Sequence, residues 1–336
     1  MTEATNGRRE MRDGIMVTHL RSGDGATALV ADHGAHLLSW CPADATEVIF
    51  LSQTSGFGDG EAVRGGVPII FPQFGERGSG KRHGIARTRE WQFVSAALDN
   101  GCAQARWKLS GKLSNAEGIA VISNPAADPV SGLRADKNAA PDAGGPNFLL
   151  TYDVRLAGGL LQLALTVANP LGDPAQDVLL KPDDCAETQL ALASGRIEPA
   201  TLRFHAALHT YLRVPDLATA GLQGLQGQRY VDQVLQGAQA TQSQDILAFS
   251  REVDRIYPDA PSSLRLQSPV GPLCVEQTGF ADTVVWNPGV DKAITLSDLH
   301  PGGYREFICV EAAAIMRPIS LLPGEHWRGT QRLRVA

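Results

Sequence analysis

The feature that most constrains the fold is an alternation of apolar and polar residues with a period of two. It is clearest in residues 159–169, GLLQLALTVAN. One face of this segment in an extended chain would carry Leu161, Leu163, Leu165 and Val167. Because Gln162 and Thr166 fall on the opposite face, the pattern predicts a strand with one face buried and the other near solvent.

Short runs of the same kind recur along the chain, separated mostly by Gly, Pro, Asn and Asp. They occupy residues 16–20, 27–32, 48–52, 91–98, 148–156, 201–208, 263–268, 272–277, 283–287 and 305–313. Windows with helical spacing are few, and within residues 216–237 the glycines at 221, 224 and 227 would each cost about 1 kcal/mol inside a helix. We interpret that window as loop and strand, and predict an all-β antiparallel sandwich.

The chain has 336 residues, of which 43% are hydrophobic, enough for the core of one large domain. We predict a single domain over residues 1–336, with a loop insertion at about 110–147. This stretch has no aromatic residue and is rich in Pro, Gly, Asp and Asn. The alternative is a linker between two domains, since strand patterns lie on both sides.

Several classes of protein are disfavoured by composition. The formal net charge of −6 argues against a general partner for nucleic acid or anionic membranes. The first residues lack the apolar core of a signal peptide, and no apolar run approaches the length of a membrane span. Five scattered cysteines suggest neither disulfides nor a zinc site. We therefore expect a cytoplasmic protein, monomeric by default, without a metal site.

One motif in the chain imitates a nucleotide-binding loop. Residues 75–81, GERGSGK, fit the pattern GxxxxGK, but Arg82 stands where Ser or Thr would bind magnesium. Two prolines precede the motif, and a poor amphipathic pattern follows it. The sequence therefore argues against a nucleotide-binding loop here.

The stronger signal is a concentration of positive charge within this acidic chain. Residues 64–89 contain six Arg or Lys residues and only one acid, Glu76. Glycines and prolines place these side chains on loops, where a rigid scaffold can direct them at a ligand. Because an arginine fork suits phosphate or carboxylate, we interpret the segment as a candidate anion site. The alternative is a solvated basic loop.

Two further residues are candidates for acid–base chemistry. His209 lies at the end of a strand-like run, where it could act near neutral pH or be a buried structural histidine. In residues 304–315, Glu311 shares an otherwise apolar face with Phe307 and Cys309. Burial there would raise the pKa of the carboxyl group towards that of a useful base, unless Arg305 or Arg317 is a structural partner.

Taken together, these segments resemble the aldose 1-epimerase (galactose mutarotase-like) superfamily, and most closely its glucose-6-phosphate 1-epimerase branch. The matching strings, in order, are GAHLLSW, AVRGGVPIIFPQFG, HGIARTREW, FHAALHTYLRVPDL, EVDRIY, TVVWNPGVDKAITLSDL, YREFICVEAAAI and LLPGEHW. They extend from about residue 15 to the end. The segment from about 110 to 147 is longer than usual for the family.

The resemblance implies a single β-supersandwich domain whose concave face holds a sugar. It implies His209 as general acid and Glu311 as general base. It further implies Arg64 and Arg87 at a phosphate, His83 near the sugar and Asp254 on sugar hydroxyls; Arg82 would add a cation. The implied activity interconverts the α and β anomers of a hexose 6-phosphate, with no cofactor. The alternatives are a mutarotase of unphosphorylated aldoses and a non-catalytic carbohydrate-binding module.

Overall fold

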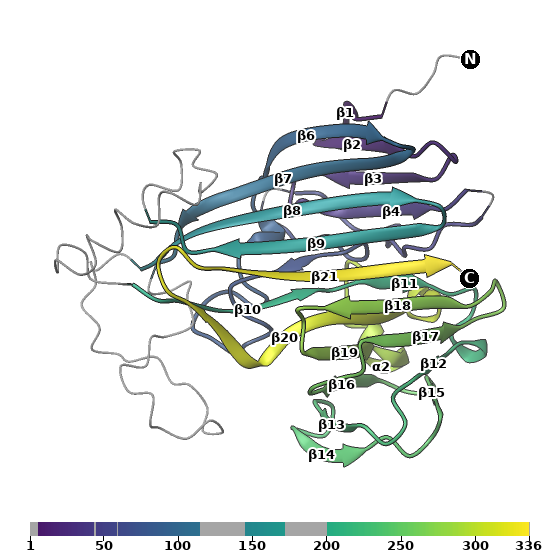
Figure 1. The fold of residues 1–336 in the computed structure, drawn as a ribbon. Coiled ribbons are helices and arrows are strands. Elements are labelled where there is room, and N and C mark those ends of the chain that lie inside the picture. Colours follow the sequence, from purple (N-terminus) through teal and green to yellow (C-terminus); the bar gives the residue numbers. More distant parts are fainter. Residues whose placement is uncertain (1–5, 44, 59, 115–144, 172–199, 336) are drawn as a thin grey trace.

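The computed structural model describes residues 6–43, 45–58, 60–114, 145–171 and 200–335. Nearly all regular structure in this part of the chain is antiparallel strand, arranged in three sheets (Figure 1). The only helical elements described are short: η1 (Ala86–Thr88), η2 (Leu217–Thr219), α2 (Gly289–Ala293) and η3 (Gly303–Glu306). The predicted all-β sandwich is confirmed.

The first large sheet carries the residues of greatest interest and has the order β14-β13-β16-β19-β20-β10-β5, with β11 also paired to β20. Its strands are β5 (Ile69–Ile70), β10 (Leu202–Leu208), β11 (Tyr211–Arg213), β13 (Arg229–Asp232), β14 (Ala238–Thr241), β16 (Val253–Tyr257), β19 (Asp282–Asn287) and β20 (Phe307–Leu321). The long strand β20 pairs with β19 on one side and with β10 and β11 on the other.

The second large sheet has the order β15-β12-β17-β18-β21-β9-β8-β7-β6. Its strands are β6 (Gln92–Asp99), β7 (Cys102–Lys112), β8 (Asn147–Ala157), β9 (Leu160–Ala168), β12 (Gly221–Gln223), β15 (Ile246–Ala248), β17 (Ser263–Gln267), β18 (Leu273–Thr278) and β21 (His326–Val335). A smaller sheet contains β1 (Arg8–Arg12), β2 (Ile15–Arg21), β3 (Thr27–Ala31) and β4 (Leu37–Cys41).

The main core lies between the two large sheets. It contains Val310 of β20, Trp107 of β7 and, fully buried on one face of β9, Leu161, Leu163, Leu165 and Val167. Gln162 and Thr166, on the other face of β9, remain partly exposed. The alternation in this segment therefore predicted its buried face correctly.

The other predicted runs coincide with strands, with one exception. Residues 48–52 form isolated bridges, Ile49 with Leu212 and Leu51 with Gly65, rather than a strand. The window 216–237 contains η2, β12 and β13, in agreement with its interpretation as loop and strand apart from the single 3-10 turn.

The proposed insertion at about 110–147 falls largely on residues 115–144, outside the described residues. At its ends the chain is still strand, because Lys112 of β7 pairs with Asn147 of β8. The segments on either side are thus consecutive strands of one sheet.

Two findings bear on the compositional expectations. Within the described ranges, no helix has the length and hydropathy needed to cross a membrane. Four cysteines, Cys41, Cys102, Cys274 and Cys309, are free thiols, whereas Cys185 lies outside the described residues.

We expect the β9 core face to contribute strongly to stability. Leu163→Ala leaves a cavity between the sheets, so the free energy of unfolding should fall by roughly 2–5 kcal/mol. Gln162→Ala, on the partly exposed face of the same strand, should cost less than about 1 kcal/mol. Urea-induced unfolding followed by tryptophan fluorescence checks both. Equal losses would contradict the assignment of the two faces.

Candidate functional site

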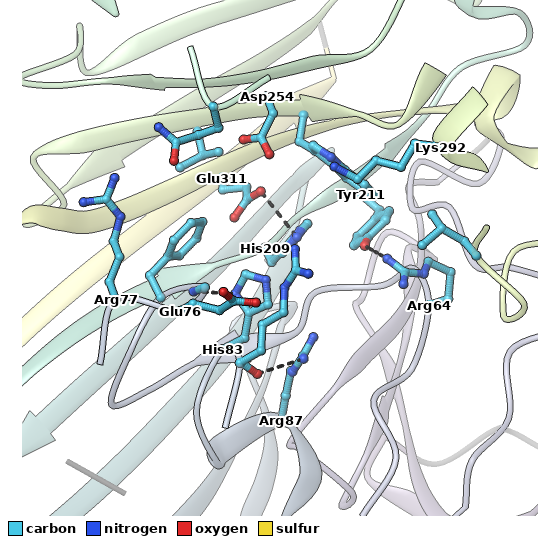
Figure 2. A pocket seen from close by; sticks show the side chains of 17 residues that line it. Arg64, Glu76, Arg77, His83, Arg87, His209, Tyr211, Asp254, Lys292 and Glu311 are labelled. Atoms are coloured by element: carbon cyan, nitrogen blue, oxygen red, sulfur yellow. Dashed lines mark hydrogen bonds and ion pairs between the residues drawn. The ribbon is translucent and has the colours of Figure 1, made fainter. Parts of the chain in front are cut away.

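The register between β20 and its neighbours brings His209 and Glu311 together. Leu208 pairs with Ala312 at the end of β10, and Tyr211 pairs with Cys309 at the start of β11. His209, in the break between these strands, therefore lies opposite Glu311 on the same face of the sheet. Its imidazole Nε2 is 3.4 Å from the Oε1 atom of Glu311 (Figure 2).

The two faces of β20 have different surroundings, as the alternation in the sequence predicted. Val310 and Ile308 pack into the core between the sheets. Phe307 and Cys309 pack with Tyr211 and Trp286 on the opposite face, next to Glu311. Neither suggested arginine partner of Glu311 is found there: Arg317 forms an ion pair with Asp259, and the titratable side chain in contact with Glu311 is that of His209. The alternative of a structural arginine partner is therefore wrong.

A cavity of about 600 Å³ opens over this face, within the range usual for small-molecule sites. Every site residue named from the sequence lines it: Arg64, Arg82, His83, Arg87, His209, Asp254 and Glu311. They come from the loops before and after β5, from η1, from β16, from the β10–β11 break and from β20. The structure thus gathers seven residues spread over some 250 positions of sequence.

Burial dominates the electrostatics of the central pair. Desolvation raises the pKa of Glu311 well above its ordinary value, and the nearby Asp254 carboxylate adds to this effect. Desolvation, with His83 and the Arg87 and Arg64 cations, lowers the pKa of His209 well below its ordinary value. Both shifts favour a neutral carboxylic acid beside a neutral imidazole. The outer atoms of the pair, Glu311 Oε2 and His209 Nδ1, are buried with no hydrogen-bond partner among the described residues.

Asp254 lies on β16, which is separated from β20 and Glu311 by strand β19. The register pairs it with Trp286, which pairs in turn with Cys309 of β20. Burial raises the pKa of Asp254 to about 6, against the opposing effect of the Lys292 cation. The site thus contains two carboxyl groups with raised pKa values in one cavity, an arrangement typical of functional sites.

The two arginines assigned to an anion differ in what they already bind. Arg64 donates from Nε to Asp298 at 3.1 Å and from Nη1 to the Tyr211 hydroxyl at 3.0 Å. Arg87 donates from Nη2 to the Arg82 carbonyl at 3.1 Å, while its buried Nε has no partner within the described ranges. Burial lowers the pKa of Arg87 to about 10, which still leaves it charged at neutral pH. Arg87 is therefore the cation with the larger unused donor capacity.

Two sequence interpretations of other chemistry are tested by this geometry. The GERGSGK segment follows a two-residue strand, β5, and leads to the three-residue η1, so the strand–loop–helix context of a nucleotide-binding loop is missing, as expected. In the described part of the chain, no group of three or more His, Cys, Asp or Glu side chains is placed to hold a metal ion.

Several residues of the site were not predicted from the sequence. The ring of Tyr211 stacks on His209 with centroids 4.8 Å apart, and Asp298 fixes Arg64. The signal for Tyr211 was present, because it is two positions after His209 and shares its face. Asp298 and the cavity-lining Arg77 lie on loops, and nothing local in the sequence links them to the site.

Comparison with known proteins agrees with the fold and identifies the family. The model of the family described as aldose 1-epimerase matches residues 16–114 and 185–334. A protein of Cenchrus ciliaris named "Putative glucose-6-phosphate 1-epimerase" is 30% identical over 318 residues, covering 94% of this chain and 83% of that protein. A protein of the same name from Escherichia coli K12 is 28% identical over 290 residues, covering 85% of this chain and 79% of that protein.

Solved structures show the same architecture. A crystal structure described as a "putative mutarotase" from Salmonella typhimurium superposes with a TM-score of 0.74 at 23% identity, covering 98% of this chain and 92% of the other. At that identity the likeness shows the fold, whereas the family match covers most of the sequence. The chain belongs to the aldose 1-epimerase family, and it is an isomerase of the mutarotase type.

Proposed function

We propose that the protein interconverts the α and β anomers of a hexose 6-phosphate, with glucose 6-phosphate as the substrate to test first. One observation carries the proposal: the buried His209–Glu311 pair faces the same cavity as Arg64, Arg82 and Arg87. The names of the relatives from Cenchrus ciliaris and Escherichia coli support the same substrate class.

Anomer exchange requires two coupled proton transfers. The carboxylate of Glu311 accepts the proton of the C1 hydroxyl while the C1–O5 bond breaks, and the imidazolium of His209 donates a proton to O5. The product is the open-chain aldehyde. Rotation about the C1–C2 bond exposes the other face of the carbonyl group. Ring closure then reverses both transfers, so that each residue acts once as acid and once as base.

The number of protons held by His209 and Glu311 fits this reaction. A neutral Glu311 with a neutral His209 has the same net charge and the same number of protons as a Glu311 carboxylate with a His209 imidazolium. One internal proton transfer over the 3.4 Å between Oε1 and Nε2 therefore prepares the reactive form. Hydroxyl and ring oxygens of a sugar would supply partners for Glu311 Oε2 and His209 Nδ1.

The arginine cluster supports a phosphorylated substrate over a free aldose. Arg87 has a buried Nε donor without a partner, and a phosphate oxygen accepts such a bond with charge assistance. Arg64 is held by Asp298 and Tyr211 and presents its guanidinium in a fixed orientation. A non-catalytic carbohydrate-binding module would need no buried acid–base pair, which makes that alternative the weaker one.

Removal of either member of the pair should abolish most catalysis. In Glu311→Gln and in His209→Asn, the rate of anomer exchange with glucose 6-phosphate should fall by roughly 10²- to 10⁴-fold, because a general acid or base is lost. Exchange NMR measures the rate above that of buffer. Glu276→Gln, on β18 outside the cavity, is the matched control and should keep full activity. An unchanged rate in Glu311→Gln would assign the base to another residue.

Replacement of Arg87 should separate phosphorylated from free substrates. Arg87→Ala should lower kcat/KM for glucose 6-phosphate by roughly ten- to a hundredfold, since a charge-assisted hydrogen bond is worth about 1.5–3 kcal/mol. Activity on free glucose should change little, and Arg87→Lys should be intermediate because it keeps the charge but loses the fork. Arg106→Ala, which removes an ion pair with Asp153 on the other large sheet, is the control. Equal losses on both sugars would favour the mutarotase of unphosphorylated aldoses.

The raised pKa of Asp254 gives opposite pH signatures in activity and stability. Asp254 ionises as the pH rises through about 6, and a carboxylate accepts sugar hydroxyls more strongly than the neutral acid. For free glucose, which does not titrate there, kcat/KM should fall as the pH drops through about 6, and Asp254→Asn should remove this dependence.

The stability effect has the other sign. Since the folded-state pKa of Asp254 is raised above its ordinary value, its contribution to stability is complete at low pH and is lost as the pH rises through about 6. Asp254→Asn should therefore raise the melting temperature at pH 7.5 relative to the parent protein, but not at pH 4. A gain confined to pH 4 would contradict the direction of the shift.

A further inference from the structure

The glycine-rich segment that imitates a nucleotide-binding loop is folded around one buried side chain, that of Gln73. The Gln73 carboxamide nitrogen donates to the carbonyls of Gly75 and Gly80, both at 3.1 Å. Its oxygen accepts the backbone N–H of Gly80 at 2.8 Å. Gln73 is 0% exposed, so these three bonds form away from water, where an unpaired polar group would be costly.

The two ends of the loop are also joined to each other. The backbone N–H of His83 donates to the Gly75 carbonyl at 3.0 Å, and the backbone N–H of Gly75 donates to Nδ1 of the His83 ring at 3.3 Å. His83 adopts a left-handed backbone with φ of 64°, which is unusual for a residue other than glycine. A Cβ atom at Gly78 would lie 2.4 Å from the Gln73 oxygen. The segment thus closes tightly around Gln73.

This closure defines which nitrogen of His83 carries the proton. Because Nδ1 accepts the Gly75 N–H, a neutral His83 ring must carry its proton on Nε2. The ring is neutral at physiological pH, since burial and the Arg87 and Arg82 cations lower its pKa well below the ordinary value. His83 lines the cavity, with its centroid 5.7 Å from that of His209. It is therefore a neutral hydrogen-bond donor beside the acid–base pair.

We propose that Gln73 is a positioning residue of the anomer-exchange site. Its carboxamide holds the loop Gly75–Gly80 in place and thereby sets the Gly75 N–H against the His83 ring. The Nε2–H group of His83 is then presented to a sugar oxygen. Gln73 itself does not line the cavity. The proposal rests on the proposed function for the contact between His83 and the substrate. It gives the GERGSGK segment a role unrelated to nucleotide binding.

Kinetics of a double-mutant cycle test the proposal. Gln73→Ala and His83→Ala should each lower kcat/KM for glucose 6-phosphate about tenfold, the loss expected for one substrate hydrogen bond, mainly through a higher KM. In a protein that already carries His83→Ala, the further substitution Gln73→Ala should change kcat/KM by less than about twofold, because both substitutions remove the same contact. Fully additive losses, or a Gln73→Ala rate within about twofold of the parent's, would overturn the proposal.

The chain offers a matched control in Gln277 of β18. Gln277 is also buried, and it donates to the carbonyls of Phe280 and Asp282 in a turn that does not line the cavity. Gln277→Ala should lower stability without changing kcat/KM. If it impaired kcat/KM as much as Gln73→Ala does, the effect of Gln73 would be one of general stability, and the positioning role would be wrong.

A structural measurement separates this proposal from the proposed function. In the parent protein, the ¹⁵N resonances of His83 should show an unprotonated Nδ1 that accepts a hydrogen bond and a protonated Nε2. A protonated Nδ1 would overturn the proposal even if Gln73→Ala did not fold. In Gly78→Ala, whose new methyl group displaces the Gln73 oxygen, the Gly75 and Gly80 amides should exchange faster with deuterium; unchanged exchange would contradict the role of Gln73. If the parent protein catalysed no anomer exchange, the proposed function would fail. The ¹⁵N and deuterium-exchange measurements would still test whether Gln73 positions the loop and His83.

Discussion

The site depends first on the register of strand β20 against β10 and β11. Leu208 opposite Ala312 and Tyr211 opposite Cys309 leave His209 facing Glu311 across the break between β10 and β11. A slip of one residue would turn Glu311 into the core between the sheets and expose Val310 in its place. The burial of Val310 and Ile308 therefore does more than stabilise the sandwich. It also specifies which side chains can meet in the cavity.

Burial has a second consequence, which is electrostatic. A carboxyl group and an imidazole taken out of water both favour their neutral forms, so the pKa of Glu311 rises and that of His209 falls. The pair can then exchange a proton without a change in net charge, which suits a reaction in which one proton is removed and another is supplied. The aromatic rings of Tyr211 and Trp286 against His209 maintain this low-polarity setting.

The arginines of the site differ in how many of their hydrogen-bond donors are already used. Asp298 and the Tyr211 hydroxyl bind Arg64 and fix its guanidinium, whereas Arg87 keeps a buried donor without a partner in the described part of the chain. The acidic net charge of the chain would suggest no affinity for anions. The local concentration of arginine on loops around one cavity is the better guide, because screening and distance leave a compact anion sensitive mainly to its neighbours.

The sequence by itself determined which side chains share a face and where positive charge gathers. Alternation of period two identified the buried face of β9 and placed Glu311 on the face of β20 opposite Val310, because the direction of a side chain in a strand is a local property. Resemblance to a family predicted roles for His209, Arg64 and Arg87. Only the tertiary structure decided which residues meet: His209 rather than Arg305 or Arg317 beside Glu311, Asp298 on Arg64, and the loop of residues 75–83 around Gln73. These contacts join segments that no periodicity relates, and they depend on sheet register and loop closure, which the whole fold sets.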